Sequence, residues 1–265
     1  MTKGKMTDEI APLIVRIAEA PGVEMVWSLA TDYFRSMGFS RVNYGYTRFL
    51  HGSGIGNPAD AMFLTTASPD YATRYFAGGL YARTPAFKWA HANTGACTWK
   101  WVREAMEAGT LTPDELAALR QNATMGVRAG ITISFPEASA RAKGAMGLIA
   151  DPDLTEADVE RLFVSRGTAL QAVAQVMHLK LVQMPFSARK RALTTRQREV
   201  LEWVAGGKTA QDVATVMAIS LAMVEKHLKL AREALDADTT AQAVAKATLL
   251  NLIFQPQPLA DAAAV

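Results

Sequence analysis

The chain has 265 residues, one cysteine and a formal net charge of +3, and 50% of its residues are hydrophobic. This length suffices for one large or two small domains with a buried core, and the single Cys97 excludes an internal disulfide and a multi-cysteine metal site. No apolar run reaches the roughly 18 residues that span a bilayer, and residues 1–7 have no apolar segment behind them, as a secretion signal needs. We therefore expect a cytoplasmic globular protein without a membrane or metal partner.

Helical and strand-like segments alternate over the first two thirds of the chain. Apolar residues at helical spacing predict helices over 7–20 and 23–37, from Ser68-Pro69, within 104–124 around a break at 109–113, and over 155–184. Runs of β-branched and aromatic residues predict strands over 42–49, 62–66, 129–135 and 144–149. Segment 81–101 gives no clear prediction. Helices, a small sheet and further helices indicate an α–β–α sandwich.

Small residues near the strand starts leave room for a cavity against the sheet; they are Gly126, Gly130, Gly144 and Gly147. Aromatic residues supply large rigid walls for such a cavity; the candidates are Tyr71, Tyr75, Trp89, Trp99 and Trp101. Each of them could instead be an ordinary core residue. Their hydroxyl and indole N–H groups favour a pocket, because buried polar groups need partners.

Three short helices with sharp starts follow a linker over 184–192, which combines Pro185 with a short basic cluster. Thr194 and Gln197 form a capping-box pattern, Gly206-Gly207 ends the first helix, and Thr209 and Ser220 begin the second and third. Two helices joined by a tight turn, the second basic on its outer side, are typical of the helix-turn-helix motif that enters the DNA major groove.

Charged residues on this outer face are the candidate DNA contacts. Lysine pairs with guanine and glutamate accepts from cytosine, so Glu225, Lys226 and Lys229 are the base-reading candidates. Lys208, at the start of the second helix, and Arg232 are expected to hold phosphates. The other four candidates besides Lys208 lie on the third helix and are expected to point outward. The alternative for each of the five is a solvated surface charge. His227 is interpreted as a packed core residue.

The C-terminal pattern as a whole supports a family resemblance. It comprises Leu193-Thr194, Arg196, Glu199-Val200-Leu201, Trp203, Ala205, Gly207-Lys208-Thr209, Val213-Ala214, Ile219-Ser220, Val224 and His227-Leu228. This pattern resembles the DNA-binding domain of LuxR-family transcription factors. In that family a final helix, here within 238–254, joins two DNA-binding domains. The resemblance therefore implies a homodimer on double-stranded DNA with a two-fold operator, whose half-sites lie about 10 bp apart, and RNA polymerase is a further candidate partner.

A second pattern lies upstream and consists of Pro69, Tyr71, Tyr75, Thr84-Pro85 and Trp99, followed by Gly126 to Gly130. It resembles, over about residues 7–180, the autoinducer-binding domain of the same family, which binds N-acyl-homoserine lactones between sheet and helices. The resemblance implies a small-molecule site at Tyr71, Tyr75, Thr84, Trp99 and Gly130. It places Tyr75 at the acyl-amide end of the ligand, Trp99 against the lactone ring, and Gly130 where close packing is needed.

Two positions depart from the family pattern. Tyr71 stands where the family usually has a tryptophan that donates to the lactone carbonyl, and Thr84 stands where it has an aspartate that accepts the ligand's amide N–H. Loss of a carboxylate acceptor removes a hydrogen bond worth about 1.5–3 kcal/mol. The ligand could therefore be an acyl-homoserine lactone or an atypical signal.

The expected chain is α+β, with an autoinducer-binding-like sandwich over 1–183, the linker, an all-α helix-turn-helix domain over 193–254 and a tail over 255–265. One function is a DNA-binding regulator of the quorum-sensing LuxR type that senses a small molecule. The alternative is a ligand-independent regulator whose first domain only dimerises or binds a protein partner. An enzyme is not expected, nor are catalytic residues or a cofactor, because no serine elbow, phosphate loop, paired metal ligands or Cys/His dyad is present.

Overall fold

The computed structural model describes residues 3–50, 54–185 and 192–255, with the side chains of residues 3–9 left aside. The chain forms two compact units, Met1–Val182 and Gln183–Val265. The domain boundary proposed from the sequence, between 183 and 184, lies one residue from this division. Most of the proposed linker and most of the proposed tail lie outside the described residues. No helix in the described part of the chain is long and apolar enough to cross a membrane.

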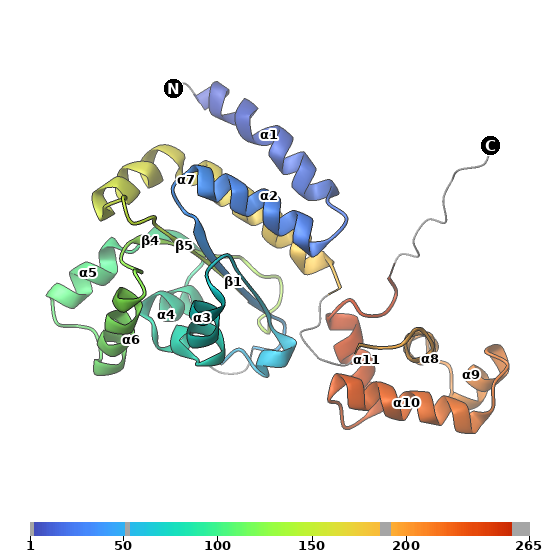
Figure 1. Cartoon of the computed structure of the whole chain (residues 1–265). Coiled ribbons are helices and arrows are strands. Elements are labelled where there is room, and N and C mark those ends of the chain that lie inside the picture. The colour runs from blue at the N-terminus through green and yellow to red at the C-terminus, as the bar shows by residue number, and fades with distance from the viewer. Residues whose placement is uncertain (1–2, 51–53, 186–191, 256–265) are drawn as a thin grey trace. The chain divides into compact units, whose positions relative to one another are not determined.

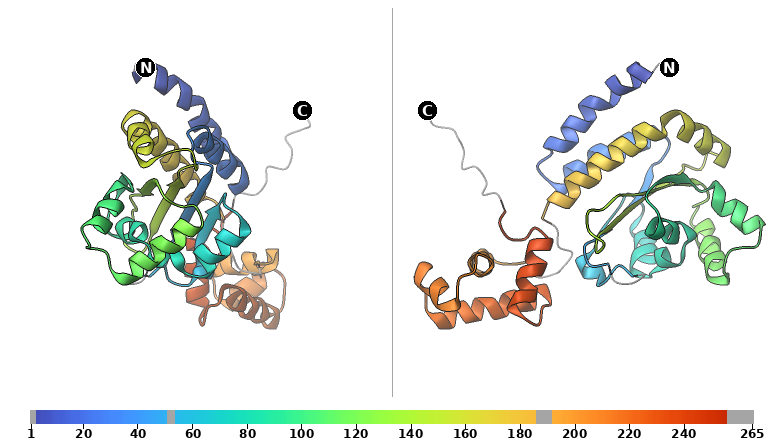
Figure 2. Two further views of the ribbon diagram at one scale, coloured as in Figure 1. Left: turned by 60° about the vertical axis from the view of Figure 1, so that its left-hand side comes forward. Right: turned by 180° about the vertical axis from the view of Figure 1, so that it is seen from behind.

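The first unit is built on a five-stranded antiparallel sheet with the strand order β2-β1-β5-β4-β3. Its strands are β1 (Arg41–Thr47), β2 (Met62–Thr65), β3 (Gly95–Thr98), β4 (Gly130–Ser134) and β5 (Lys143–Ile149). Its helices are α1 (Lys3–Glu19), α2 (Val23–Ser36), α3 (Pro69–Ala72), α4 (Pro85–Ala92), α5 (Lys100–Glu107), α6 (Pro113–Thr124) and α7 (Glu156–Gln183). Figures 1 and 2 show α1, α2 and α7 on one side of the sheet and α3 to α6 on the other. The predicted α–β–α sandwich is confirmed.

Strand β3 is absent from the sequence prediction, which left segment 81–101 open. The strand is four residues long, and it begins with Gly95 and Ala96, two residue types that are depleted in strands. It forms because its residues pair with β4, for example Ala96 with Ile133 and Thr98 with Ile131. Packing and pairing in the sheet thus decide its conformation, and local sequence does not.

Helix α7 is attached to the sheet by a buried polar residue that the sequence did not single out. The imidazole of His178 is 1% exposed; its Nδ1 lies 3.0 Å from the Tyr44 hydroxyl and its Nε2 lies 3.1 Å from Glu137 Oε1. The ring stacks on Phe135 with a centroid distance of 4.1 Å. One ring nitrogen thus forms a hydrogen bond with the Tyr44 hydroxyl, and the other lies beside the Glu137 carboxylate.

The second unit consists of α8 (Thr195–Ala205), α9 (Ala210–Val216), α10 (Leu221–Leu235) and α11 (Thr240–Leu249). Thr194 and Thr209 each form a complete capping box, with Gln197 and Asp212 as partners. Ser220 and Thr239 cap the next two helices. The predicted helix-turn-helix is confirmed: α9 and α10 are its two helices and pack around Val200, Val213 and Val224.

Candidate functional site

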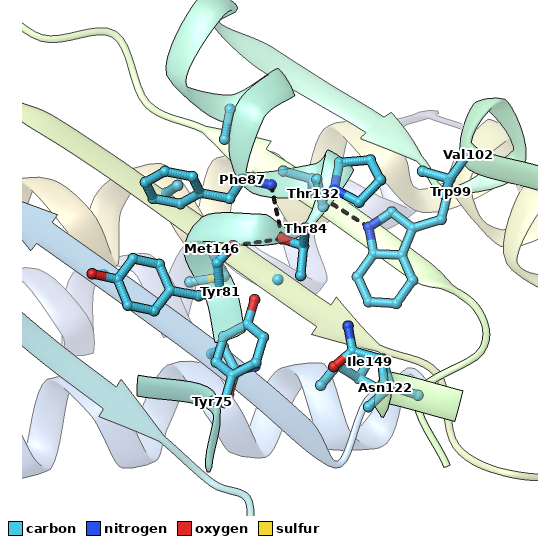
Figure 3. A pocket seen from close by; sticks show the side chains of 18 of the residues that line it. Tyr75, Tyr81, Thr84, Phe87, Trp99, Val102, Asn122, Thr132, Met146 and Ile149 are labelled. Atoms are coloured by element: carbon cyan, nitrogen blue, oxygen red, sulfur yellow. Dashed lines mark hydrogen bonds between the residues drawn. The ribbon is translucent and has the colours of Figure 1, made fainter. Parts of the chain in front are cut away.

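A cavity of about 530 Å³ lies between the sheet and helices α3 to α6 (Figure 3). We call it the sheet cavity; its main aromatic walls are Tyr71, Tyr75, Phe76, Tyr81, Phe87 and Trp99. The exposed side chains of Arg103, Arg120 and Arg128 also border it and lie at its opening. Arg103 is paired with Glu107 at 2.8 Å and with Glu156 at 2.9 Å. A concave, largely apolar pocket with a few polar groups is the usual form of a small-molecule site.

Tyr71 presents a hydroxyl group to this cavity. Its oxygen accepts a hydrogen bond from Asn43 Nδ2 at 2.8 Å, and Asn43 in turn accepts from Thr65 at 2.7 Å. Burial raises the pKa of Tyr71 to about 12, so the phenol is neutral at physiological pH. Since its oxygen is the acceptor in the bond from Asn43, its proton is left to donate to a ligand.

Tyr75 and Thr84 lie side by side in the wall. The Tyr75 ring stacks on Tyr71 at a centroid distance of 5.2 Å, and burial raises the pKa of its hydroxyl, while an interaction with Thr84 lowers it in part. The Thr84 hydroxyl is buried, donates to the Tyr81 carbonyl at 2.8 Å and accepts from the Phe87 N–H at 3.2 Å (Figure 3). Thr84 is therefore the N-cap of α4 and retains one acceptor lone pair.

Trp99 faces the cavity with its ring, because its indole N–H is used internally and donates to Thr132 Oγ1 at 2.8 Å. Gly130 stands directly behind this ring. A Cβ atom at Gly130 would lie 2.9 Å from the Trp99 ring and 2.3 Å from the Leu148 carbonyl oxygen. Gly130 is thus not a wall residue; it allows Trp99 to lie flat against the sheet.

Four of the five residues predicted for ligand binding therefore line one cavity, namely Tyr71, Tyr75, Thr84 and Trp99. The fifth, Gly130, packs against Trp99. Sequence reasoning missed Asn43, Thr132 and Asn122, which also line it. Asn43 and Thr132 belong to strands whose pairing decides which side chains face the cavity. Asn122 did carry a signal, because it shares the inner face of α6 with Ala118 at a spacing of four residues.

The residues predicted for DNA binding differ in exposure. Lys208, Glu225, Lys226 and Lys229 are exposed, and the last three share one face of α10. Arg232 was expected to point outward, and this is corrected. It is half-buried and donates to the Asp238 carbonyl at 3.3 Å, because it lies one turn further along, where α10 meets the connection to α11.

Comparison with known proteins agrees with this architecture. The family model of the autoinducer binding domain matches residues 22–181, and the model of bacterial regulatory proteins of the luxR family matches residues 191–247. The transcriptional activator SolR of Ralstonia solanacearum is 29% identical over 224 residues, which cover 83% of this chain and 88% of SolR. The quorum sensing-dependent transcriptional regulator RpaR of Rhodopseudomonas palustris is 39% identical over 105 residues, which span 39% of this chain and 40% of RpaR.

Two solved structures share the fold at low sequence identity. Escherichia coli SdiA superposes with a TM-score of 0.54 at 17% identity, covering 94% of this chain and 99% of SdiA. SdiA in complex with octanoyl-rac-glycerol gives a TM-score of 0.50 at 15% identity, covering 97% and 100% of the two chains.

A cavity-bearing α–β–α sandwich followed by a helix-turn-helix defines a class of bacterial transcriptional regulators. This chain belongs to the LuxR family of that class, with an autoinducer-binding domain and a DNA-binding helix-turn-helix. It is a quorum-sensing type of transcriptional regulator, and the family consists of regulators rather than enzymes.

Proposed function

We propose that the sheet cavity binds a small molecule with a polar head group and an acyl chain, and that this binding controls recognition of DNA by α10. The observation that carries the proposal is the cavity itself, about 530 Å³ in volume and walled by aromatic side chains with few polar groups. Acyl chains bind favourably between apolar walls, because moving each CH₂ group from water into apolar surroundings is favourable by about 0.8 kcal/mol.

Three polar residues are proposed to orient the head group. Tyr71 donates its free proton to a ligand carbonyl, Thr84 accepts with its remaining lone pair, and Trp99 covers the head group with its ring face. Tyr75 closes the wall beside Thr84, and Gly130 keeps Trp99 in place. The SdiA complex with octanoyl-rac-glycerol combines an eight-carbon acyl chain with a polar head, so both acyl-homoserine lactones and acylglycerols belong in a test.

For the second unit, we propose a homodimer on a two-fold operator in the cytoplasm, with α10 in the major groove. Glu225, Lys226 and Lys229 are the proposed base contacts, and Lys208 and Arg232 the proposed phosphate contacts. The bond from Arg232 to the Asp238 carbonyl uses Nη1, which leaves other N–H donors of the guanidinium for a phosphate. RNA polymerase is the partner through which such a regulator could act.

The proposal is tested by thermal unfolding of the purified chain with N-acyl-homoserine lactones of graded length, octanoylglycerol and octanoate. A ligand at 100 times its Kd adds about 2.7 kcal/mol of stability, which is readily seen as a rise in Tm. Gly147→Phe is the matched control, because Gly147 lines the cavity and a Cβ atom there meets only Trp99, at 4.0 Å. The phenyl ring would fill the cavity.

The expected outcome is a Tm rise in the wild type that is absent in the folded Gly147→Phe variant. An equal rise in both proteins places the ligand elsewhere and contradicts the proposed site. A wild-type protein that responds to no compound, yet binds its operator, supports the ligand-independent regulator instead.

A further inference from the structure

Asn122 is a buried polar residue in the wall of the sheet cavity that the site described above does not use. It lies near the end of α6 and is 7% exposed. Its backbone carbonyl accepts from the Met125 and Val127 N–H groups, both at 3.0 Å. The helix end is thus held by the backbone, and no part of this arrangement depends on the side-chain amide.

The side-chain oxygen of Asn122, in contrast, is buried without a hydrogen-bond partner among the described residues. In Figure 3 the amide points into the cavity, and the Tyr75 hydroxyl and the Trp99 ring border the same space. A buried amide oxygen normally accepts a hydrogen bond, so an unpartnered one in a cavity wall points to a partner that the described residues do not supply. Rotation by 180° exchanges its oxygen and nitrogen within the same volume, so either can face a ligand.

The polar groups proposed to orient the head group leave one role open. Tyr71 offers a proton, the Trp99 N–H is engaged by Thr132, and Thr84 retains only one lone pair of a hydroxyl that already has two partners. Among the lining residues in the described part of the chain, the Asn122 side-chain oxygen and His91 Nε2 are buried without a hydrogen-bond partner. The Asn122 oxygen belongs to the amide that borders the same space as Tyr75 and Trp99, so it is the free acceptor beside the proposed head-group site. A site built to pair with such a donor rejects an analogue that lacks it, because the acceptor then stays buried and unpaired.

We propose that Asn122 is a specificity-determining residue that accepts a hydrogen bond from an amide N–H in the ligand's head group. The sheet cavity then selects N-acyl amides over O-acyl esters of the same shape. This inference rests on the proposed ligand-binding function and adds the residue and the chemical class of the head group.

The test uses N-octanoyl-homoserine lactone and its ester isostere, in which oxygen replaces the N–H. Both are titrated against the wild-type chain and against Asn122→Leu, which has nearly the same shape and no polar atoms. The wild type is expected to prefer the amide by about tenfold or more. In Asn122→Leu this preference is expected to fall towards one, through weaker binding of the amide.

A second measurement separates ligand recognition from a structural role. Replacement of an unpartnered buried amide by an apolar group should leave the Tm of the ligand-free protein unchanged or raise it. Leu119→Ala, which removes an apolar wall residue of the same helix, should lower both the Tm and the affinity for the two compounds. Asn122→Ala serves as the second variant should leucine be too bulky.

An amide preference that survives in Asn122→Leu overturns the proposal, and so does the absence of any preference in the wild type. A lower Tm of both ligand-free Asn122 variants also overturns it, because Asn122 would then be a structural residue. If the wild type binds neither compound, the proposed function itself is contradicted for this ligand class, while the Tm values of the ligand-free variants still test the unpartnered state of Asn122.

Discussion

At the scale of single residues, the contact between Gly130 and Trp99 sets how closely the cavity wall approaches the sheet. Gly130→Ala should destabilise the protein by about 1–3 kcal/mol, because the new methyl group meets both the Trp99 ring and the rigid Leu148 carbonyl. Chemical denaturation measures this change. Gly147→Ala is the matched control in β5; there the methyl group has room, and we expect stability from unchanged to about 1 kcal/mol higher. Equal stabilities of the two variants would contradict the packing argument.

Thr84 is the second residue with a defined consequence. Thr84→Asp keeps the cap of α4, because aspartate is an equally good N-cap, and it adds a charged acceptor beside Tyr75. We expect the affinity for acyl-homoserine lactones to rise about ten- to a hundredfold, measured by calorimetric titration. Thr84→Val, which loses both the cap and the acceptor, is the control of similar shape. Unchanged binding by Thr84→Asp at every acyl length would contradict the placement of the head group near Thr84.

Glu115 gives a prediction about pH. Lys88, 2.8 Å away, together with the Thr112 cap, holds the pKa of Glu115 at about 2, below its ordinary value of 4.5. The ionised form thus stabilises the fold fully above about pH 4.5, and this contribution disappears as the pH falls towards 2. Near neutral pH the free energy of unfolding of the wild type should exceed that of Glu115→Gln by about 1–2 kcal/mol. This range allows for solvent screening at the half-exposed Lys88. This difference in stability should disappear on acidification, which a series of denaturation curves at decreasing pH measures. Glu107→Gln, at an exposed position of α5, is the surface control for the substitution itself.

At the scale of elements, α10 separates its charged face from its apolar face. Val224 and Ala231 are buried in the unit, whereas Lys226 and Lys229 are exposed. Lys229→Ala should therefore weaken binding to the specific operator by about 1–3 kcal/mol without changing the Tm. Gel-shift titrations at several salt concentrations measure this loss. Lys100→Ala in α5, an equal change of charge on the other unit, should leave operator binding intact; a similar loss in both would mean that only net charge matters.

Helix starts and strand β3 show what local sequence can and cannot decide. A threonine or serine at the cap position forms its hydrogen bonds within four residues, so the starts of α6, α8 and α9 were predictable. Strand β3 depends on a partner strand more than thirty residues away. Its existence follows from the pairing and not from its own residues.

At the scale of the whole molecule, two exposed apolar side chains on and after α11 fit the proposed homodimer. Leu249 is 43% exposed and Phe254 is 62% exposed. Leu249→Glu should weaken binding to an operator with two half-sites about tenfold or more and leave binding to one half-site unchanged. Sedimentation and gel-shift titrations on the two DNAs measure this difference. Val164→Glu, another exposed apolar position, should have no effect, and equal losses on both DNAs would contradict a role in pairing.

Local residue patterns were enough to predict the α+β class and the DNA-binding helices, because capping, glycine stops and apolar spacing act over a few residues. It also marked Tyr71, Tyr75, Thr84 and Trp99 through a family pattern. Three features follow from tertiary packing alone: Gly130 supports Trp99, the side-chain oxygen of Asn122 is buried without a partner within the described ranges, and Arg232 turns to the Asp238 carbonyl. Each of these depends on side chains brought together from separate elements, and such distances are set by packing rather than by local propensity.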